Sequence, residues 1–326
     1  MRAIVLDRPG KPADLYEKEM KRPNPGPGEI RVRVHAASLN PVDYKLVAAG
    51  HPDWIYPFIP GLDAAGVIDA VGEQAGGWAV GDEVFFHGDL SQPGVFAEYA
   101  ITTAHTTARL PRGLSFIEAA ALPCAGMTAY QAVKRKISMA GMRSILIHGG
   151  AGGVGGFAIQ LAHLAGLTVM TTCSPQNNQL VLELGADYAI DYRNDDVTDR
   201  VMELTAGQGA DAIVNTISPD SAKEDIDRLA FNGHLVCIAG FPDLSDINTR
   251  DRAISIHTVA LGRAHVSGDR HAQQDLARMA AELGQLAADG KVQAMVREVI
   301  DLSEIPMWLE QLSGRHVNGK IVVDLT

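Results

Sequence analysis

The stretch SILIHGGAGGVGGFAIQLAHLAGLTVMTTCS, from Ser144 to Ser174, contains no Asp, Glu, Lys or Arg. Seven glycines lie between Gly149 and Gly166, and six of them occupy the eight positions 149–156. A membrane-spanning helix needs about 20 predominantly apolar residues, and this density of glycine, interrupted also by His and Gln, excludes one. The run divides instead into an apolar strand, a glycine-rich turn, a helix with an apolar face and a second apolar strand, which is one βαβ unit.

The glycines of the turn fit the pattern GxGxxG at Gly150, Gly152 and Gly155. Between a strand and a helix, such glycines let the backbone approach a pyrophosphate, and the first-turn amides and the helix dipole favour an anion. A tight turn that binds no ligand could show the same glycine spacing. We expect a dinucleotide cofactor, with its pyrophosphate against Gly150, Ala151, Gly152, Gly153 and Val154.

The end of the second strand indicates which dinucleotide is bound. NAD-binding units of this type place Asp or Glu there, about 20 residues after the turn, to bind the ribose 2′-OH. Here the position falls near Ser174, and the next acid is Glu183. Ser174 and Asn178 can donate hydrogen bonds to a 2′-phosphate, and YAIDYR supplies Tyr192 and Arg193 at the end of the third predicted strand. The sequence favours NADPH, although SPQNNQ itself holds no Lys or Arg.

The rest of the middle region repeats the alternation of strand and helix. DDVTDRVMELTAGQGA predicts a helix with Asp195 or Asp196 as N-cap, and SAKEDIDRLAFNG predicts a helix that ends at Gly233. ADAIVNTI and HLVCIAGF predict buried strands. This order predicts an open, doubly wound parallel sheet that binds its ligand at the carboxyl ends of the strands. The residues expected to border the cofactor there are Thr216, Ile217, Gly240 and Phe241.

The first 120 residues have a different pattern. EIRVRVHAASL, GVIDAVG and FAEYAIT alternate as strands do, with Pro and Gly between them, which predicts a β-rich unit. After amphipathic helices near 271–289 and 304–312, the strand GKIVVDLT could close back onto this unit.

Charge and cysteine content limit the possible partners and location. A net charge of −11 argues against nucleic acid or an anionic membrane as a partner. Three cysteines are too few for a disulfide framework, and the N-terminus lacks an apolar signal segment, so we expect a cytoplasmic protein.

Several segments resemble the medium-chain dehydrogenase/reductase superfamily over nearly the whole chain. They are IPGLDAAGVIDAVG followed by VGDEVF, LPCAGMTAYQAV, HGGAGGVG, LGADYAIDY and NGKIVVDL. SLNPVDYK is similar to the zinc-independent quinone oxidoreductase and alkenal or enone reductase subgroup. The resemblance implies an α/β protein with a GroES-like β-rich catalytic domain, 1–124 completed by 266–326, around a Rossmann domain at 125–265. It also implies a homodimer.

The resemblance also assigns roles to single residues. It implies that Asn40 borders the nicotinamide, that Lys45 bonds the nicotinamide ribose and that the Thr128 hydroxyl approaches the nicotinamide. Asn40 could equally shape the turn before Pro41, and Lys45 could lie on the surface. Reduction of an enone or a quinone develops negative charge on oxygen and needs nearby donors. Asn40, Tyr44, Lys45 and Tyr56 are our candidates, although either tyrosine could serve packing alone.

Zinc-dependent relatives bind their catalytic metal through residues that this chain replaces. By the resemblance, Asn40 stands where they have a Cys, Leu62 where they have a His, and Asp63 where they usually have Glu, while Cys124 matches the third ligand. Three scattered cysteines also cannot form a four-thiolate structural site. We therefore expect no zinc.

Two functions agree with these observations. The first is an NADPH-dependent, zinc-independent reductase of a small-molecule quinone or α,β-unsaturated carbonyl. The second is a low-turnover NADPH-binding redox sensor or structural protein on the same scaffold, because a fold alone does not fix function.

Overall fold

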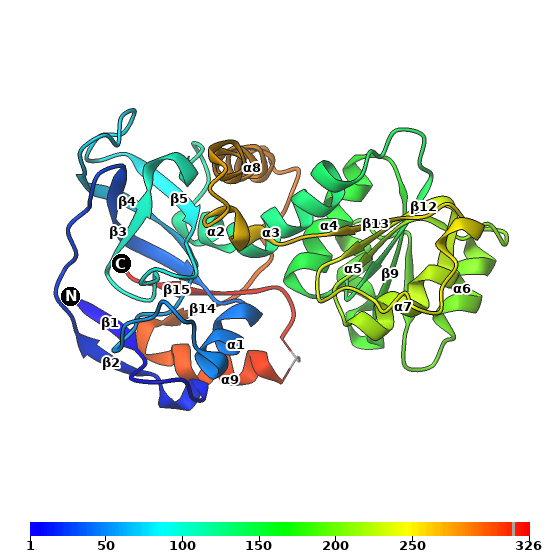
Figure 1. The fold of residues 1–326 in the computed structure, drawn as a ribbon, viewed down its shortest axis with the longest axis horizontal. Helices are drawn as coiled ribbons and strands as arrows, with labels where there is room; N and C mark the ends of the chain where they lie inside the picture. Colours follow the sequence, from blue (N-terminus) through cyan, green and yellow to red (C-terminus); the bar gives the residue numbers. More distant parts are fainter. Residues whose placement is uncertain (315–316) are drawn as a thin grey trace. The chain divides into compact units, whose positions relative to one another are not determined.

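The computed structural model describes residues 1–314 and 317–326, which form two compact units (Figure 1). One unit contains residues 1–127 and 261–326, and the other contains residues 128–260. The sequence had placed the boundaries after residues 124 and 265, with a tail, 266–326, whose residues 315 and 316 lie outside the described ones. Among the described helices, none combines the length and the apolarity needed to cross a membrane.

The second unit is built on a six-stranded sheet in which every pair of neighbours is parallel. Its order is β10-β9-β8-β11-β12-β13, so the strand order reverses between β8 and β11. This confirms the predicted doubly wound sheet. The strands are β8 (Ser144–His148), β9 (Thr168–Cys173), β10 (Tyr188–Asp191), β11 (Ala210–Asn215), β12 (Leu229–Cys237) and β13 (Ser255–Thr258).

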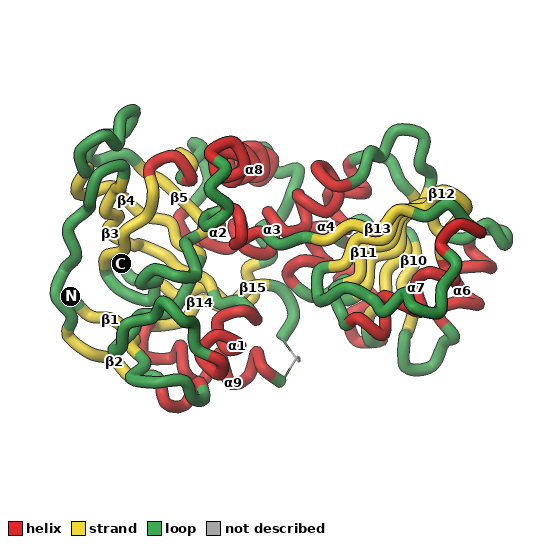
Figure 2. Tube along the Cα trace, viewed as in Figure 1, coloured by secondary structure: helices red, strands yellow, loops and turns green. Residues whose placement is uncertain are grey.

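Helices, red in Figure 2, pack around this sheet, whose strands are drawn side by side in yellow. They are α4 (Gly153–Leu164), α5 (Asn178–Glu183), α6 (Val197–Leu204) and α7 (Pro219–Arg228). The core between the layers includes Leu146, Met170, Ile213 and Leu235, each at most 1% exposed. Burying such side chains stabilises the fold by about 1.5–3 kcal/mol each. The apolar runs of the sequence are therefore strands covered on both faces.

The predicted ends of two helices are wrong. The first was extended to Ala210, but α6 ends at Leu204 and Ala210 begins β11. The second was extended to Gly233, but α7 ends at Arg228 and β12 begins at Leu229, which pairs with Ala210 of β11. Asn232 has a φ of 61°, a left-handed conformation that an α-helix does not accommodate. Pairing along the sheet therefore outweighs the helical spacing. The predicted cap of α6 is confirmed at Asp196, whose carboxylate accepts two backbone N–H groups.

The first unit contains a seven-stranded sheet, of which six strands follow the order β14-β15-β3-β4-β5-β7, with β6 also paired to β3. Only β14 and β15 pair in parallel, so this sheet is largely antiparallel. The pairing of β15 with β3 confirms that the C-terminal strand closes onto the N-terminal region. The strands are β3 (Glu29–Ser38), β4 (Asp63–Val71), β5 (Glu83–His87), β6 (Tyr99–Thr103), β7 (Ala108–Arg109), β14 (Val296–Asp301) and β15 (Lys320–Asp324).

The remaining elements of the first unit complete its core. β1 (Arg2–Val5) and β2 (Tyr16–Glu19) form a separate antiparallel pair. The helices are α1 (Pro41–Ala49), α2 (Phe116–Ala121), α8 (Arg270–Ala288) and α9 (Ile305–Ser313), and α3 (Pro123–Tyr130) leads from this unit into the second. Ile30, Ile68, Phe86 and Phe96 are fully enclosed in the core. This core fixes the ends of β3, β4 and β5, where the polar cluster described below lies.

Candidate active site

The turn between β8 and α4 requires glycine at three positions. Gly149 has a φ of 68°, and a Cβ on Gly150 would lie 2.2 Å from Thr171 Oγ1. A Cβ on Gly155 would lie 2.2 Å from the Gly149 carbonyl oxygen, so α4 packs directly on the backbone of the turn. The pattern predicted from the sequence thus produces the close approach of helix and strand that this class of turn needs.

The N-terminus of α4 is open to an anion. Its N-cap is Gly152, no side chain caps the helix, and its first turn holds no acidic residue. The first-turn amides of a helix have no intrahelical partners, and the helix dipole places partial positive charge there. The predicted pyrophosphate contacts, Gly150 to Val154, form this turn and this first helical turn. A phosphate group is the ligand that the arrangement fits.

A buried polar network supports the turn from beneath. Thr172 Oγ1 accepts the Gly149 N–H at 3.2 Å and pairs with His148 Nδ1 at 3.1 Å, and His148 Nε2 lies 2.8 Å from Asp225 Oδ1. Burial of the Asp225 carboxylate opposes ionisation, but His148 and the hydrogen bonds of Asn215 and Arg228 hold its pKa below the ordinary value. The network ties the turn to β9, β11 and α7.

The other predicted cofactor residues follow the carboxyl ends of parallel strands. Because the strands are parallel, these ends share one edge of the sheet. The Thr216 hydroxyl donates to the His148 carbonyl at 2.8 Å, so the ends of β11 and β8 adjoin. The residues at this edge are Ser174 and Asn178 after β9, Tyr192 after β10, Thr216 and Ile217 after β11, and Gly240 and Phe241 after β12.

The end of β9 presents neutral polar groups. Ser174 is buried, and its hydroxyl accepts from Asn177 Nδ2 at 3.0 Å. Asn178 Oδ1 accepts the thiol hydrogen of Cys173 at 3.3 Å, which leaves its Nδ2 directed elsewhere. Tyr192 is half-exposed, and the Arg193 guanidinium lies 5.7 Å from its ring centroid. A 2′-phosphate at this edge would meet these donors and the Arg193 guanidinium; β9 itself ends without a carboxylate, while Asp191 ends the neighbouring strand β10.

A row of polar side chains crosses the sheet of the first unit. In the antiparallel register, Ser38 of β3 lies opposite Asp63 of β4, and Asp63 lies opposite His87 of β5. Directly opposite residues share one face of a sheet. Asp63 is fully buried, and its Oδ2 accepts the Ser38 hydroxyl at 3.1 Å. Its Oδ1 accepts the backbone N–H of Cys124 at the start of α3, at 3.0 Å.

Asn40 lies at the centre of this cluster. Its Nδ2 donates to Asp63 Oδ2 at 2.9 Å, and its Oδ1 accepts from Lys320 Nζ at 2.6 Å. The residue is 1% exposed, so its amide is held by protein groups on both sides. Burial raises the pKa of Asp63, while Lys320 and the hydrogen bonds of Asn40, Cys124 and Ser38 oppose that rise. Asn40 is also the N-cap residue of α1, as a turn-shaping role requires.

Asp43 fixes the same turn. Its Oδ2 accepts the backbone N–H of Asn40 at 2.7 Å, three residues back along the chain. Burial raises the pKa of Asp43 to about 8, and the nearby Asp63 adds to the rise, although the Asn40 hydrogen bond and Lys320 oppose it. Burial therefore favours the neutral carboxyl group of Asp43 over the carboxylate.

The remaining predicted catalytic residues lie on and after α1. Tyr44 and Tyr56 are partly buried against the core of the first unit, and Tyr56 meets Trp54 edge to face. Within the described part of the chain, neither phenol makes a hydrogen bond. Lys45 is exposed, and Thr128 is buried on α3 at the start of the second unit. The phenols and the lysine are open donors, whereas the amide of Asn40 is engaged.

Comparisons with known proteins agree with both units. Residues 26–112 match the family described as alcohol dehydrogenase GroES-like domain, and residues 153–285 match the family described as zinc-binding dehydrogenase. Human quinone oxidoreductase is 32% identical over 77% of this chain and 76% of its own length. The chain belongs to the medium-chain dehydrogenase/reductase superfamily.

Solved structures place it near the quinone oxidoreductases, so the predicted quinone oxidoreductase-like subgroup is confirmed. The quinone oxidoreductase from Coxiella burnetii is 29% identical, covers 100% of this chain and 99% of its own, and superposes with a TM-score of 0.84. The Escherichia coli quinone oxidoreductase complexed with NADPH is 24% identical, covers 99% and 100% of the two chains, and has a TM-score of 0.86. This medium-chain dehydrogenase/reductase is thus an oxidoreductase whose Rossmann unit implies a nicotinamide cofactor.

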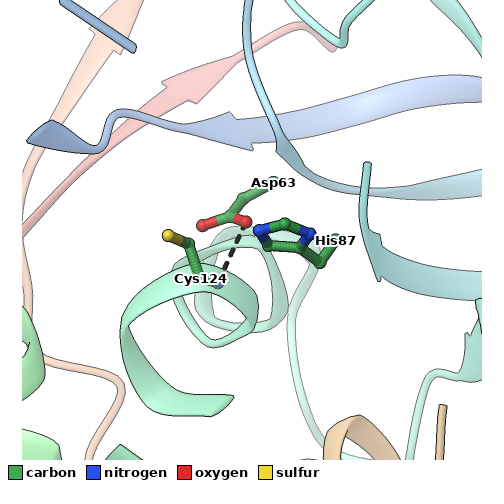
Figure 3. Close-up of side chains that lie close together, drawn as sticks. All are labelled: Asp63, His87 and Cys124. Carbon is green, nitrogen blue, oxygen red and sulfur yellow. Dashed lines mark hydrogen bonds between the residues drawn. The ribbon is translucent and has the colours of Figure 1, made fainter. Parts of the chain in front are cut away.

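Zinc, which a matched family name mentions, has one candidate site among the described residues. Asp63, His87 and Cys124 offer ligand atoms within 4.8 Å of one another. Around one zinc ion, ligand atoms lie roughly 3.3–3.8 Å apart, given metal–ligand distances of 2.0–2.3 Å. In Figure 3 the thiol and the imidazole lie on opposite sides of the carboxylate, and the dashed line marks the bond from the Cys124 N–H. The three side chains are ligand types that zinc accepts, so the charges around them bear on whether a metal fits.

Electrostatics also disfavour a metal in this cluster. Desolvation and then the Asp63 charge raise the pKa of Cys124 well above its usual value, which opposes formation of the thiolate that binds zinc. The Lys320 ammonium already lies 3.8 Å from Asp63 Oδ2. Burial lowers the pKa of His87 to about 4, which leaves the neutral imidazole that a metal can bind, and its Nδ1 lies 3.4 Å from His265 Nε2. The buried thiol and the Lys320 ammonium are therefore the features that oppose zinc at these residues.

Sequence reasoning missed three members of this cluster. From the sequence, Asp63 is only the residue that stands where zinc-dependent relatives usually have Glu. Lys320 is only part of the segment NGKIVVDL, which resembles the superfamily. His87 was not singled out from the sequence as a site residue, and it stacks on His265, from a distant part of the chain. The available signal was a lysine and an aspartate inside apolar strand segments, which are expensive to bury unless they are paired.

Proposed function

We propose that this oxidoreductase uses NADPH to reduce quinones or α,β-unsaturated carbonyls without zinc. The observation that carries the proposal is the end of β9, where Ser174 and Asn178 follow the strand at the same edge of the sheet from which α4 starts after β8, with no side-chain cap. A carboxylate at that position would repel a 2′-phosphate, and none is present before Glu183. The Escherichia coli relative complexed with NADPH supports the same fold with this cofactor.

The chain's own residues would hold the cofactor by its charged groups. The first-turn amides of α4 and the turn 149–152 would bind the pyrophosphate. Ser174 and Asn178 would donate to the 2′-phosphate, with Tyr192 and Arg193 at the next strand end. When bound, the cofactor supplies a hydride from its nicotinamide ring. Thr128 and Lys45 remain the predicted contacts of the nicotinamide end.

Reduction of an enone or quinone places negative charge on a substrate oxygen, and the protein has to stabilise that charge. Tyr44, Lys45 and Tyr56 are the candidate donors, because their polar groups are not engaged by described side chains. Asn40 has both ends of its amide engaged, so we assign it to shaping the turn that carries Tyr44 and Lys45. Without a Lewis acid, substrates whose products are stabilised anions are favoured over simple ketones.

The deciding experiment is NADPH consumption by the purified protein against a small panel. The panel contains a naphthoquinone, an alkenal, a cyclic enone, a crotonyl thioester and, as a control, a simple ketone. We expect turnover of at least one electron-poor acceptor and none of the ketone. If NADPH binds but no member of the panel is reduced, the low-turnover sensor becomes the better assignment.

Three further measurements separate the parts of the proposal. Fluorescence titration should give tighter binding of NADPH than of NADH, and equal or tighter NADH binding contradicts the cofactor choice. Activity should persist after exhaustive chelation, with no stoichiometric zinc in the protein. Activity that is lost on chelation and restored by zinc would instead place the chain among the zinc-dependent members. Light scattering would test the expected homodimer.

A further inference from the structure

Lys320 is a buried cation in the first unit. Its side chain is 3% exposed, and its Nζ donates to the Leu39 carbonyl at 3.0 Å and to Asn40 Oδ1 at 2.6 Å. The same nitrogen lies 3.8 Å from Asp63 Oδ2. A buried charge is expensive unless it is paired and hydrogen-bonded. The contacts meet both conditions, so the ammonium and the Asp63 carboxylate compensate one another.

The position of Lys320 follows from strand register. In the β15–β3 pair, Val322 lies opposite Ser38, so the antiparallel register brings residue 320 beside residue 40. In the β3–β4 pair, Ser38 lies opposite Asp63. The registers of β15, β3 and β4 thus bring together Lys320, Asn40, which lies two residues after β3, and Asp63. A one-residue slip of β15 would turn Lys320 to the opposite face of the sheet.

Asp63, whose charge Lys320 neutralises, is one of the three residues of the candidate zinc site described above. Asp63, His87 and Cys124 are ligand types that zinc and cobalt accept, with atoms within 4.8 Å of one another. In a metal site the cation would supply the positive charge that Asp63 needs. We propose that the Lys320 ammonium is the resident cation of this cluster, and that it excludes divalent metal by neutralising Asp63 and holding the Asn40 amide.

If Lys320 excludes metal, its removal should allow metal binding, whereas removal of a merely structural lysine would only destabilise the fold. Removing the ammonium leaves a buried carboxylate uncompensated, beside an imidazole and a thiol. A divalent cation can restore the lost charge if the three side chains reorient by the small distances needed to converge. Substitution of Lys320 should therefore create a metal site, with Cys124 as one ligand.

The test is Co²⁺ binding, because Co²⁺ follows zinc coordination and gives a thiolate charge-transfer band. Wild type, Lys320→Ala and Lys291→Ala are titrated with CoCl₂ in the absence of substrate and cofactor. Lys291 is the matched control, since it pairs with Asp289 at 3.2 Å in the same unit but is half-exposed. We expect Lys320→Ala to bind about one Co²⁺ at least tenfold more tightly than wild type, with no gain in the control. The band should disappear in Lys320→Ala/Cys124→Ser.

Two results would overturn the proposal. One is a wild-type protein that itself takes up one Co²⁺ or Zn²⁺ per chain in a Cys124-dependent way. The other is a folded Lys320→Ala variant, judged by circular dichroism, whose Co²⁺ affinity equals that of the Lys291→Ala control. If Lys320→Ala does not fold, Lys320→Gln serves instead. It keeps a donor for Asn40 Oδ1 without the charge, and it should also bind Co²⁺ more tightly than wild type; equal affinity counts against the proposal.

The inference extends the zinc-independent part of the proposed function, and the outcomes separate the two. Wild-type activity that requires zinc bound at Cys124 would overturn both. Failure of the folded Lys320 variants to gain Co²⁺ would overturn this inference alone, because the reduction assay does not depend on it.

Discussion

Alanine at position 155 tests whether the contact between α4 and its turn forms the cofactor site. The new Cβ would lie 2.2 Å from the carbonyl oxygen and 2.7 Å from the carbonyl carbon of Gly149, and 2.9 Å from Gly150 Cα. Ordinary contact begins at 3.4 Å, so relief of the shortest contact requires a movement of about 1.2 Å. All three atoms are backbone, so no side chain can rotate away. We expect the first turn of α4 to move off the glycine turn.

The expected cost has two parts. Overpacking costs about 1–3 kcal/mol, and the better helix propensity of alanine returns about 0.5–1 kcal/mol. The net loss in the free energy of unfolding is then about 1–2 kcal/mol. Displacing the amides costs more in cofactor binding, since a hydrogen bond to a charged group contributes about 1.5–3 kcal/mol. Loss of one or two such bonds weakens NADPH binding by roughly tenfold to a thousandfold or more.

Fluorescence titration with NADPH and urea unfolding measure the two parts separately. Gly76→Ala is the control, because no atom lies within 4 Å of its added Cβ and its φ is not positive. That variant should match wild type in both assays. NADPH affinity within about twofold of wild type in a folded Gly155→Ala variant would refute the assignment of this turn as the pyrophosphate site.

Four other substitutions test separate parts of the reasoning. Ser174→Asp should weaken NADPH binding about tenfold or more and change NADH binding little, because the new carboxylate and the 2′-phosphate, about 4 Å apart, would repel by about 1–4 kcal/mol. Titration with both cofactors measures this, and an equal loss of affinity for NADPH and NADH would mean that the ribose binds elsewhere. Asp43→Asn removes a carboxyl whose pKa burial raises from 3.8 to about 8. The folded protein keeps that proton while the unfolded chain releases it, so wild type should lose stability relative to the variant as pH rises from about 4 to 8, with no further change above. Urea unfolding across this range checks the trend, and a pH-independent difference contradicts it. Tyr44→Phe or Tyr56→Phe should lower kcat about 100-fold with little change in KM if that phenol stabilises the substrate oxygen, and unchanged kcat in both variants would exclude the phenols.

The sequence by itself determined the nucleotide-binding unit. The apolar run of β8, the glycines and the helical spacing of α4 are local features, and each follows from contacts within about 30 residues. The close packing of this turn leaves few alternatives to glycine, because a Cβ at Gly150 or Gly155 would collide with its neighbours. The edge that carries Ser174 and Thr216 follows as well, since alternating strands and helices imply parallel strands.

Tertiary structure decided what the local pattern could not. The end of α7 depends on the pairing of Leu229 with β11, and nothing in the helix's own spacing records that pairing. The cluster of Asp63, Asn40 and Lys320 joins residues up to 280 positions apart through the registers of β15, β3 and β4. Register depends on which faces are buried when distant strands meet. For that reason the sequence could identify which residues replace the zinc ligands, but only the folded sheet shows that a lysine from the last strand supplies the positive charge.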